Sequence, residues 1–303
     1  MSNRMVSDAQ PSNYSAARIA TLQAQDDDSV NPLCRTQLLA HGLKVERAIV
    51  FLHGFTNCPR QWVPLGQVFF DAGYNVFIPR MPHHGLRDRL TTALTHITAE
   101  EIIRWTDEML DLARGLGERV VVAGLSLGGA LALWAAQTRA DVALAVAIAP
   151  MIAPRGVTRA LLPVFLTASR FLPNFFVWWD RAAKENLPGP RHAYPRFPSR
   201  GMAAAFRAAR RVTSAAFKPG ATPAAQRVLL VTNANDPAVD NEAAKAIVAR
   251  WRYNGATNVA TYEFDASLGL IHDIIDPEQA QQRTDIVYPA LTALIEEQSR
   301  QQR

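Results

Sequence analysis

Short apolar runs alternate along the chain with longer segments of helical periodicity, and this alternation restricts the fold more than any other feature. The run at 47–52 reads RAIVFL and is apolar after its arginine, as expected for a strand buried on both faces. Strands separated by helices pair mainly in parallel. We therefore predict an α/β fold, with a mainly parallel central sheet and helices on both faces. The expected strands are 36–41, 47–52, 74–79, 119–123, 142–149, 227–232 and 258–264.

Helices are expected between these strands, and two of them carry start signals. Thr98 stands three residues before Glu101, the spacing of a capping box, in which each side chain hydrogen-bonds a backbone N–H at the helix start. Asp276 precedes Pro277, a pair typical of an N-cap followed by the first helical residue. We expect helices at 60–72, 127–137 and 238–253, one after Thr98, and a last one beginning at Asp276-Pro277.

The 303-residue chain is predicted to consist of a core with an arm and an insertion. Residues 1–30 are polar and end in three aspartates, so we expect a flexible N-terminal arm. Residues 151–220 interrupt the alternation and are expected to form a cap, inserted into a core of residues 31–150 and 221–303. The N-terminus lacks the apolar run of a secretory signal, which favours a cytoplasmic location. No segment is predicted to span a membrane.

Charge is distributed unevenly along the chain. The net charge is +5, whereas 151–220 alone has ten arginines and two lysines against two acidic residues, a net +10. We favour an arginine-rich face in contact with water. The alternative is weak contact with an anionic lipid surface, or with substrates bearing a carboxylate or phosphate. No motif indicates nucleic-acid binding.

The cap segment also contains six aromatic residues between 161 and 179. We expect most of them to pack against the core, as the apolar residues of a helical cap would. Some are expected to line an acyl pocket above the active site, because ligand pockets are mostly apolar with few polar groups. These aromatic residues are Phe165, Phe171, Phe175, Phe176, Trp178 and Trp179.

The two cysteines, Cys34 and Cys58, do not have the spacing of a metal site, so we predict no bound metal. For a cytoplasmic chain the favoured interpretation is two reduced thiols. The alternative is a disulfide that ties the N-terminal arm to the loop after the first core strand.

The strongest local signal is Gly124-Leu125-Ser126-Leu127-Gly128, which follows a predicted strand and opens a predicted helix. A serine on such a turn is held in a strained backbone conformation, and the residues two positions away must be small. The start of the following helix stabilises negative charge that develops beside the serine. We therefore predict that Ser126 is a nucleophile; the alternative is a glycine-rich packing turn.

A nucleophilic serine needs a histidine as base and a carboxylate to orient it, and after this type of turn the acid precedes the histidine in the chain. His192 and His272 follow Ser126, and His272 is favoured because it comes after the last predicted strand. His192 lies in the insertion and is expected to be a surface or cap residue. Asp236 directly follows the preceding strand and is favoured over Asp240, which is expected in the first turn of a helix.

The tetrahedral intermediate of acyl transfer needs backbone N–H donors. One is expected from Leu127, directly after the nucleophile. The other is expected from Phe55, in the loop His53-Gly54-Phe55 that follows the strand at 47–52, with Gly54 allowing the chain to turn. His53 could be a second base, but a structural histidine at the end of a buried strand is the favoured interpretation.

Taken together, the segments HGFTNCP, PRMPHHG, GLSLGG, NDPAVD and LGLIHD resemble those of bacterial carboxylesterases and monoacylglycerol-lipase-like members of the α/β-hydrolase superfamily. The resemblance covers about residues 36–150 and 225–295. It implies the α/β-hydrolase fold, an oxyanion-hole amide at Phe55 and a triad of Ser126, Asp236 and His272. The segment 81–85 resembles the family's P-G-H-G loop, but His83 stands where glycine is usual, so no catalytic role is carried over to His83 or His84.

These observations predict a serine esterase that hydrolyses a lipophilic, monoacylglycerol-like or shorter acyl ester through an acyl-enzyme, without a metal or organic cofactor. One alternative is a different reaction on the same triad: acyl transfer, or cleavage of an amide, thioester or carbon–carbon bond. Another is a non-catalytic binding protein, against which the complete set of serine, acid and histidine argues.

Overall fold

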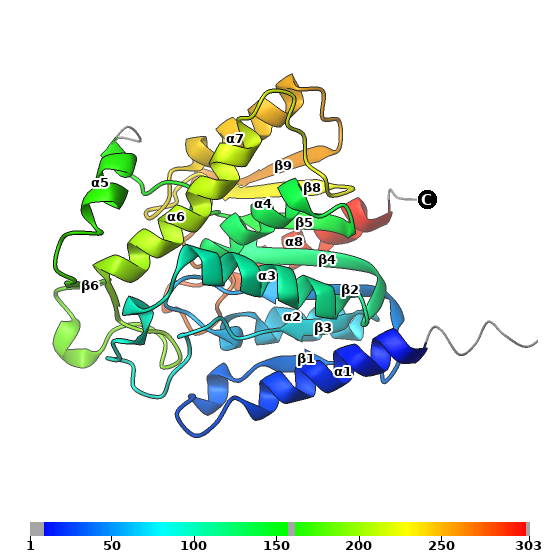
Figure 1. The fold of residues 1–303 in the computed structure, drawn as a ribbon, viewed down its shortest axis with the longest axis horizontal. Coiled ribbons are helices and arrows are strands. Elements are labelled where there is room, and N and C mark those ends of the chain that lie inside the picture. Colours follow the sequence, from blue (N-terminus) through cyan, green and yellow to red (C-terminus); the bar gives the residue numbers. More distant parts are fainter. Residues whose placement is uncertain (1–8, 157–160, 301–303) are drawn as a thin grey trace, which may run out of the picture.

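A computed structural model describes residues 9–156 and 161–300, and its centre is a seven-stranded sheet (Figure 1). The strand order is β1-β3-β2-β4-β5-β8-β9, with β1 antiparallel to β3 and every other neighbouring pair parallel. The mainly parallel sheet predicted from the alternation is therefore confirmed. The strands are β1 Gln37–Leu39, β2 Val45–Leu52, β3 Asn75–Ile78, β4 Gly117–Leu125, β5 Val142–Ile148, β8 Val228–Asn233 and β9 Val259–Phe264.

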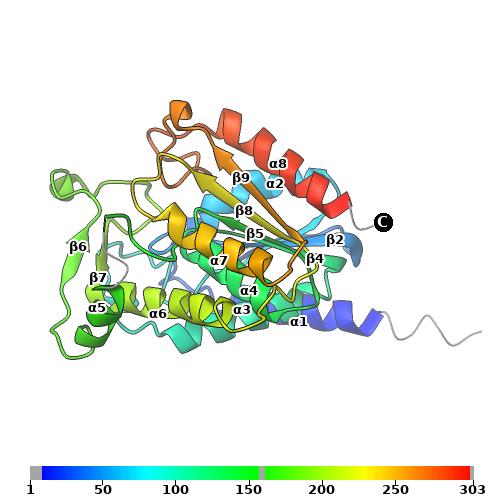
Figure 2. The same ribbon diagram turned by 90° about the horizontal axis from the view of Figure 1, so that it is seen from above.

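Helices cover both faces of the sheet (Figure 2). One face carries α2 and α8, and the other carries α3, α4, α6 and α7. The central strands are apolar throughout because both faces are buried, as in β5, where every residue is buried. The helices are α2 Val63–Asp71, α3 Ala99–Ala113, α4 Leu127–Thr138, α6 Ser199–Ala216, α7 Asn241–Tyr253 and α8 Thr284–Arg300.

The two helix-start signals had different outcomes. Thr98 is the N-cap of α3, and its Oγ1 accepts a hydrogen bond from the Glu101 N–H at 3.1 Å. The start predicted at Asp276-Pro277 is wrong, because α8 begins at Thr284. Asp276 does accept the Glu278 N–H, but its other carboxylate oxygen binds the buried His192, and the chain continues as turns. A capping side chain with a tertiary partner thus does not mark a helix here.

The expectation of a flexible arm is wrong for its described part, since α1 spans Ala9–Ala24; residues 1–8 of the arm lie outside the described residues. The helix buries Ile19 and packs beside α3. Asp26 is buried after it, where its carboxylate accepts hydrogen bonds from the Arg80 guanidinium and the Thr36 N–H, both at 2.6 Å. The aspartate run therefore includes an anchoring residue as well as solvated ones.

Cys34 and Cys58 form a disulfide, so the expectation of reduced thiols is wrong in this structure. A short 3₁₀ helix, Pro32–Cys34, brings the first cysteine against the loop after β2, with 5.2 Å between the two Cα atoms. Both cysteines are buried. Because disulfides persist mainly in oxidising compartments, the cytoplasmic location stays a prediction. No helix in the described ranges is long and apolar enough to cross a membrane.

The cap segment is the range 151–220, and its described part before α6 lies at the end of the sheet toward which the strand arrows point (Figure 2). It contains α5 Leu162–Ala168, a small antiparallel pair of β6 Phe176–Trp178 and β7 Arg196–Pro198, and the long helix α6. Helix α6 packs against α3 and α4 through small buried residues, including Ala208 beside Ile103. The cap segment thus contributes α6 to the helical layer that covers one face of the sheet.

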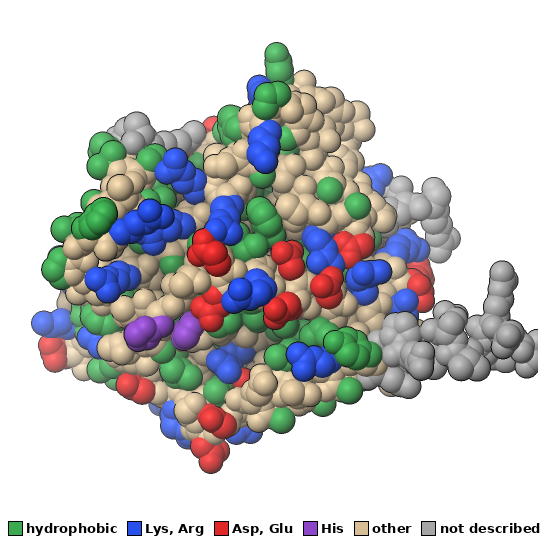
Figure 3. Space-filling model, viewed as in Figure 1, with side chains coloured by type: hydrophobic (Ala, Val, Ile, Leu, Met, Phe, Trp, Pro, Cys, Tyr) green, Lys and Arg blue, Asp and Glu red, His purple; other side chains and the backbone are tan. Residues whose placement is uncertain are grey.

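The prediction that most cap aromatics pack against the core is wrong. Phe165, Phe171, Phe175 and Trp179 are exposed, Phe171 to 83%. Basic side chains lie over α5 and α6 on the face shown in Figure 3, and acidic side chains mix with them toward α3. A groove beside α5 and α6 is lined by the basic residues Arg170, Arg207, Arg210, Arg211 and Lys218.

Candidate active site

Ser126 stands at the sharp turn between β4 and α4, with φ 58° and ψ −113°. This left-handed conformation is strained for a residue with a side chain. The turn is possible only because the chain approaches itself closely on either side. A Cβ at Gly124 would lie 2.1 Å from the Gly128 carbonyl oxygen, and a Cβ at Gly128 would lie 1.9 Å from that of Leu52. The two glycines of the motif are therefore required sterically.

His272 and Asp236 meet beyond the ends of β8 and β9, although 36 positions separate them in the sequence. The Nδ1 of His272 lies 2.8 Å from Oδ2 of Asp236. The other carboxylate oxygen of Asp236 accepts the N–H groups of Ala238 and Val239. Burial alone would raise the pKa of Asp236, but these hydrogen bonds and the imidazole outweigh it and hold the pKa below its ordinary value. The acid is thus ionised at neutral pH.

The residues considered as alternatives to this pair have other partners. Asp240 is the N-cap of α7, where its carboxylate accepts the Glu242 N–H. His192, expected to be a surface or cap residue, lies in the cap segment and is buried, so the surface alternative is wrong. Its two ring nitrogens lie 2.8 Å from Asp276 and 3.2 Å from Glu278. His192 therefore joins the cap segment to the loop after His272.

The 53–58 loop follows β2 and passes beside the serine. A Cβ at Gly54 would lie 3.6 Å from the Ser126 Cβ, an ordinary contact, and Gly54 is not left-handed, so this turn does not require a glycine. Within the described ranges, neither the Phe55 N–H nor the Leu127 N–H has a hydrogen-bond acceptor. The two amides predicted from the sequence are therefore available to a ligand.

Two histidines near this loop, His53 and His84, are buried. His53 is buried with one ring nitrogen 3.0 Å from the Gly54 carbonyl oxygen, and the other accepts the Met81 N–H, as expected for a structural histidine. Burial lowers its pKa to about 3. Burial also lowers the pKa of His84, whose ring packs against those of His53 and Phe55. His83 has φ 65°, the left-handed conformation that favours glycine.

A cavity of about 830 Å³ opens between the core and the cap segment, and Ser126, His272 and Phe55 all line it. The indole N–H of Trp179 donates to the Thr56 hydroxyl at 2.9 Å, so the cap segment is docked directly on the 53–58 loop. Apolar residues of the lining include Met151, Trp179, Phe197, Met202, Phe206 and Val239. Polar residues of the lining include Asn57, Gln61, Asp273, Gln279 and Gln281.

Residues 49–273, about three quarters of the chain, match the sequence model of the Alpha/beta hydrolase family. The chain belongs to this family. The match contains Ser126, at the sharp turn that we call the elbow, together with Asp236, His272 and the 53–58 loop. Among the described residues of this α/β hydrolase, no three histidine, cysteine, aspartate or glutamate side chains are grouped as metal ligands.

Known relatives of this α/β hydrolase include lipases. A thermostable monoacylglycerol lipase from Bacillus sp. (strain H-257) is 31% identical over 100 residues, which cover 31% of this chain and 36% of that protein. Two solved structures share the fold. A monoacylglycerol lipase from Paleococcus ferrophilus aligns with TM-score 0.63 and 19% identity, over 87% of this chain and 98% of that one. A soluble variant of monoglyceride lipase from Saccharomyces cerevisiae aligns with TM-score 0.66 and 12% identity, over 87% and 91%.

Supporting residues of this α/β hydrolase site were not predicted from the sequence. Asn233 ends β8, and its side-chain amide donates to the carbonyl oxygens of Leu270 and Ile271, directly before His272. Gln61, in the 3₁₀ helix Pro59–Trp62 that follows the 53–58 loop, donates a hydrogen bond to Asp273, the residue after His272. Their positions in the sequence could have marked two of them as candidates, because Asn233 lies at the end of a strand and Asp273 is adjacent to His272. The hydrogen-bond partner of each cannot be inferred from the sequence.

Proposed function

We propose that this chain is a serine hydrolase that cleaves lipophilic carboxylic esters through an acyl-enzyme, with Ser126, His272 and Asp236 as the triad. One observation carries the proposal. The imidazole of His272, hydrogen-bonded to Asp236 at 2.8 Å, lines the same cavity as the elbow serine. A strained serine, a histidine and a buried carboxylate in this arrangement are the components of acyl transfer.

In the proposed reaction, His272 removes the proton from the Ser126 hydroxyl as the oxygen attacks the ester carbonyl carbon. The amides of Phe55 and Leu127 stabilise the oxyanion, because they donate to charge that exists only in the intermediate and its transition states. His272 then protonates the leaving alcohol, and the acyl-enzyme remains. Next, His272 activates a water that attacks the acyl carbonyl and releases the carboxylic acid. Throughout, Asp236 holds the imidazole tautomer and stabilises its charged form.

The proposed substrate class rests on the mixture of residues that line the cavity. The apolar residues, supplied by the core and the cap segment, suit an acyl chain. The polar residues, with amide and carboxylate groups, suit an alcohol portion that can hydrogen-bond. The Bacillus relative is a monoacylglycerol lipase, a name that agrees with such an amphipathic ester. In this proposal residues 151–220 act as a cap that completes the acyl pocket.

A chain-length series of p-nitrophenyl esters tests the substrate class. We expect kcat/KM to rise from acetate to medium acyl chains, because each additional methylene buried against the apolar lining residues contributes about 0.8 kcal/mol. Phe206→Ser should flatten this rise by placing a polar group in the pocket. A series in which acetate is the best substrate for the unmodified protein would contradict an acyl pocket in this cavity.

Paired substitutions test the assignment of the acid. Asp236→Asn is expected to lower kcat by roughly 10⁴-fold, because the neutral amide cannot stabilise the imidazolium and favours the wrong tautomer. Asp240→Asn is the matched control and should retain turnover, since asparagine also caps helices well. Steady-state kinetics on one ester suffices. If Asp240→Asn is the damaging substitution, the acid has been assigned to the wrong residue.

A further inference from the structure

The side chain of Gln61 connects the two loops that carry the proposed oxyanion amide and the proposed base. Its Oε1 accepts the Gly54 N–H at 2.9 Å, and its Nε2 donates to Oδ1 of Asp273 at 2.8 Å. Gly54 directly precedes Phe55, and Asp273 directly follows His272. One buried amide thus spans the distance between both halves of the site.

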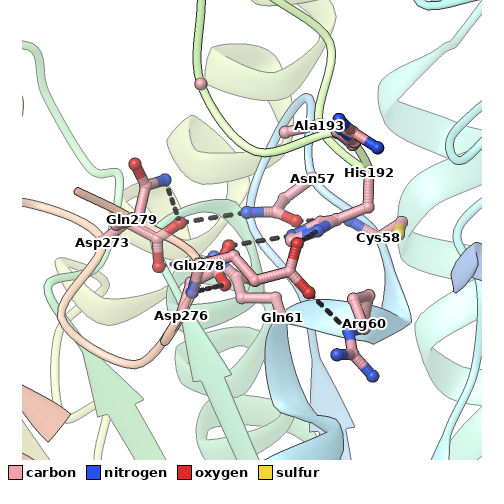
Figure 4. A network of polar contacts seen from close by, with 12 residues as sticks. Asn57, Cys58, Arg60, Gln61, His192, Ala193, Asp273, Asp276, Glu278 and Gln279 are labelled. Atoms are coloured by element: carbon pink, nitrogen blue, oxygen red, sulfur yellow. Dashed lines mark hydrogen bonds and ion pairs between the residues drawn. The ribbon is translucent and has the colours of Figure 1, made fainter. Parts of the chain in front are cut away.

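Asp273 is surrounded by amide donors, as Figure 4 shows. Besides Gln61, its carboxylate accepts hydrogen bonds from Asn57 at 3.0 Å and from Gln279 at 3.1 Å. An ionised carboxylate accepts hydrogen bonds and cannot donate them. A glutamine amide, in contrast, could be placed in either of two orientations. Asp273 therefore determines that the nitrogen of Gln61 faces the carboxylate and its oxygen faces Gly54.

We propose that Gln61 and Asp273 are positioning residues, which hold the Gly54–Phe55 amides in register with Ser126 and His272. The proposal rests on the proposed esterase function. Loss of the link would let the 53–58 loop shift, and the Phe55 N–H would no longer point at the developing oxyanion. Neither residue is required to touch the reacting atoms, so both act through the groups that they hold.

Other charged groups surround the link, and they bear on its pH dependence. Two effects raise the pKa of Asp273 to about 6: its burial away from water, and repulsion from the nearby Asp276 carboxylate. The carboxylate is therefore largely ionised at neutral pH and becomes protonated in mild acid. Among the described residues, the other charged or titratable groups around this network are His53 on the 53–58 loop, His272 and Glu278 on the histidine side, Arg60, Tyr288 on α8, and His192 from the cap segment.

Gln61→Met tests the link, because methionine has a similar volume and makes neither hydrogen bond. We expect kcat to fall about 10- to 100-fold with KM changed much less, since the oxyanion amides act mainly on the transition state. Gln137→Met is the matched control. Gln137 also makes two side-chain hydrogen bonds, to Trp251 and to the Thr222 carbonyl, far from the cavity. Gln137→Met should lower the melting temperature and leave kcat unchanged.

The pH dependence of the activity of Gln61→Glu distinguishes a hydrogen-bonded link from a role of Gln61 in packing alone. At about pH 8 two carboxylates face each other, and their repulsion should open the link. At about pH 6 the pair retains one proton; the introduced carboxylic acid can then donate to Asp273 and still accept the Gly54 N–H. We expect the activity of Gln61→Glu relative to the unmodified protein to rise at least several-fold from the higher pH to the lower.

The outcomes separate this proposal from the proposed function. Lack of ester hydrolysis by the unmodified protein would overturn the function itself. If the unmodified protein is active, a kcat of Gln61→Met equal to that of Gln137→Met overturns the positioning role. So does a relative activity of Gln61→Glu that stays flat with pH. Should Gln61→Met fail to fold, the pH profile of Gln61→Glu, purified at about pH 6, decides alone.

Discussion

Ser126→Ala is expected to abolish ester hydrolysis, with kcat falling by roughly 10⁴- to 10⁶-fold. The hydroxyl oxygen is the only non-hydrogen atom removed, and without it no acyl-enzyme can form. The residual rate would come from substrate binding and the two oxyanion amides. Hydrolysis of p-nitrophenyl butyrate measures the loss. In parallel, a fluorophosphonate probe should label the unmodified protein and leave Ser126→Ala unlabelled.

The fold should survive this substitution, because alanine retains the Cβ that already fits the strained turn. Circular dichroism and a thermal melt check this. Ser214→Ala is the matched control: Ser214 is exposed on α6, outside the cavity, and its variant should hydrolyse and become labelled normally. Turnover by Ser126→Ala at the rate of the unmodified protein would contradict Ser126 as the nucleophile, and with it the acyl-enzyme.

His272→Ala is expected to lower kcat by a similar factor, because a neutral serine hydroxyl is a poor nucleophile without a base. His96→Ala, at an exposed histidine, is the control. His192→Ala is a sharper comparison. It removes the link to Asp276 and Glu278 and should lower stability, with a much smaller effect on kcat. A large fall in kcat for His192→Ala, together with full activity of His272→Ala, would assign the base to His192 in place of His272.

His272→Ala should also change how the stability of the fold depends on pH. The folded-state pKa of Asp236 is below its ordinary 3.8, because hydrogen bonds and His272 outweigh the effect of burial. Asp236 therefore stabilises the fold above that pH, and this contribution is lost as pH falls through the folded pKa. His272→Ala removes the imidazole and leaves a buried carboxylate with fewer donors. Its melting temperature should fall most at neutral pH, and the difference should shrink below about pH 4.

The fold could be predicted where sequence pattern and burial coincide. The strand at 47–52 and the elbow at 124–128 are apolar or small for reasons that act within a few residues. α1 gives a weak pattern, because Ile19 and the half-buried Leu22 supply most of its described contact with the core. Asp276 shows the converse: its local signal is strong, but a tertiary bond to His192 uses the side chain.

The proposed triad of Ser126, Asp236 and His272 was selected from the glycine-serine motif, from chain order and from positions directly after predicted strands, since parallel strands end on the same side of the sheet and bring their loops together. Gln61 could not be selected in this way. It lies in the 3₁₀ helix Pro59–Trp62, where a glutamine has no evident role, and its partner Asp273 is 212 positions away. Asp273 itself resembles any acidic residue in a loop. Such links depend on contacts between distant side chains, which composition and periodicity do not encode.

The bond between Cys34 and Cys58 has a consequence for how the protein should be handled. It closes a loop with a sequence separation of 24 and so restricts the unfolded chain, an effect worth about 3–4 kcal/mol in the chain-entropy description. Cys58 also belongs to the loop that contains Phe55. Protein prepared under reducing conditions would therefore lack this disulfide next to the site. The concentration of dithiothreitol in an assay buffer should then affect both the stability and the activity that are measured.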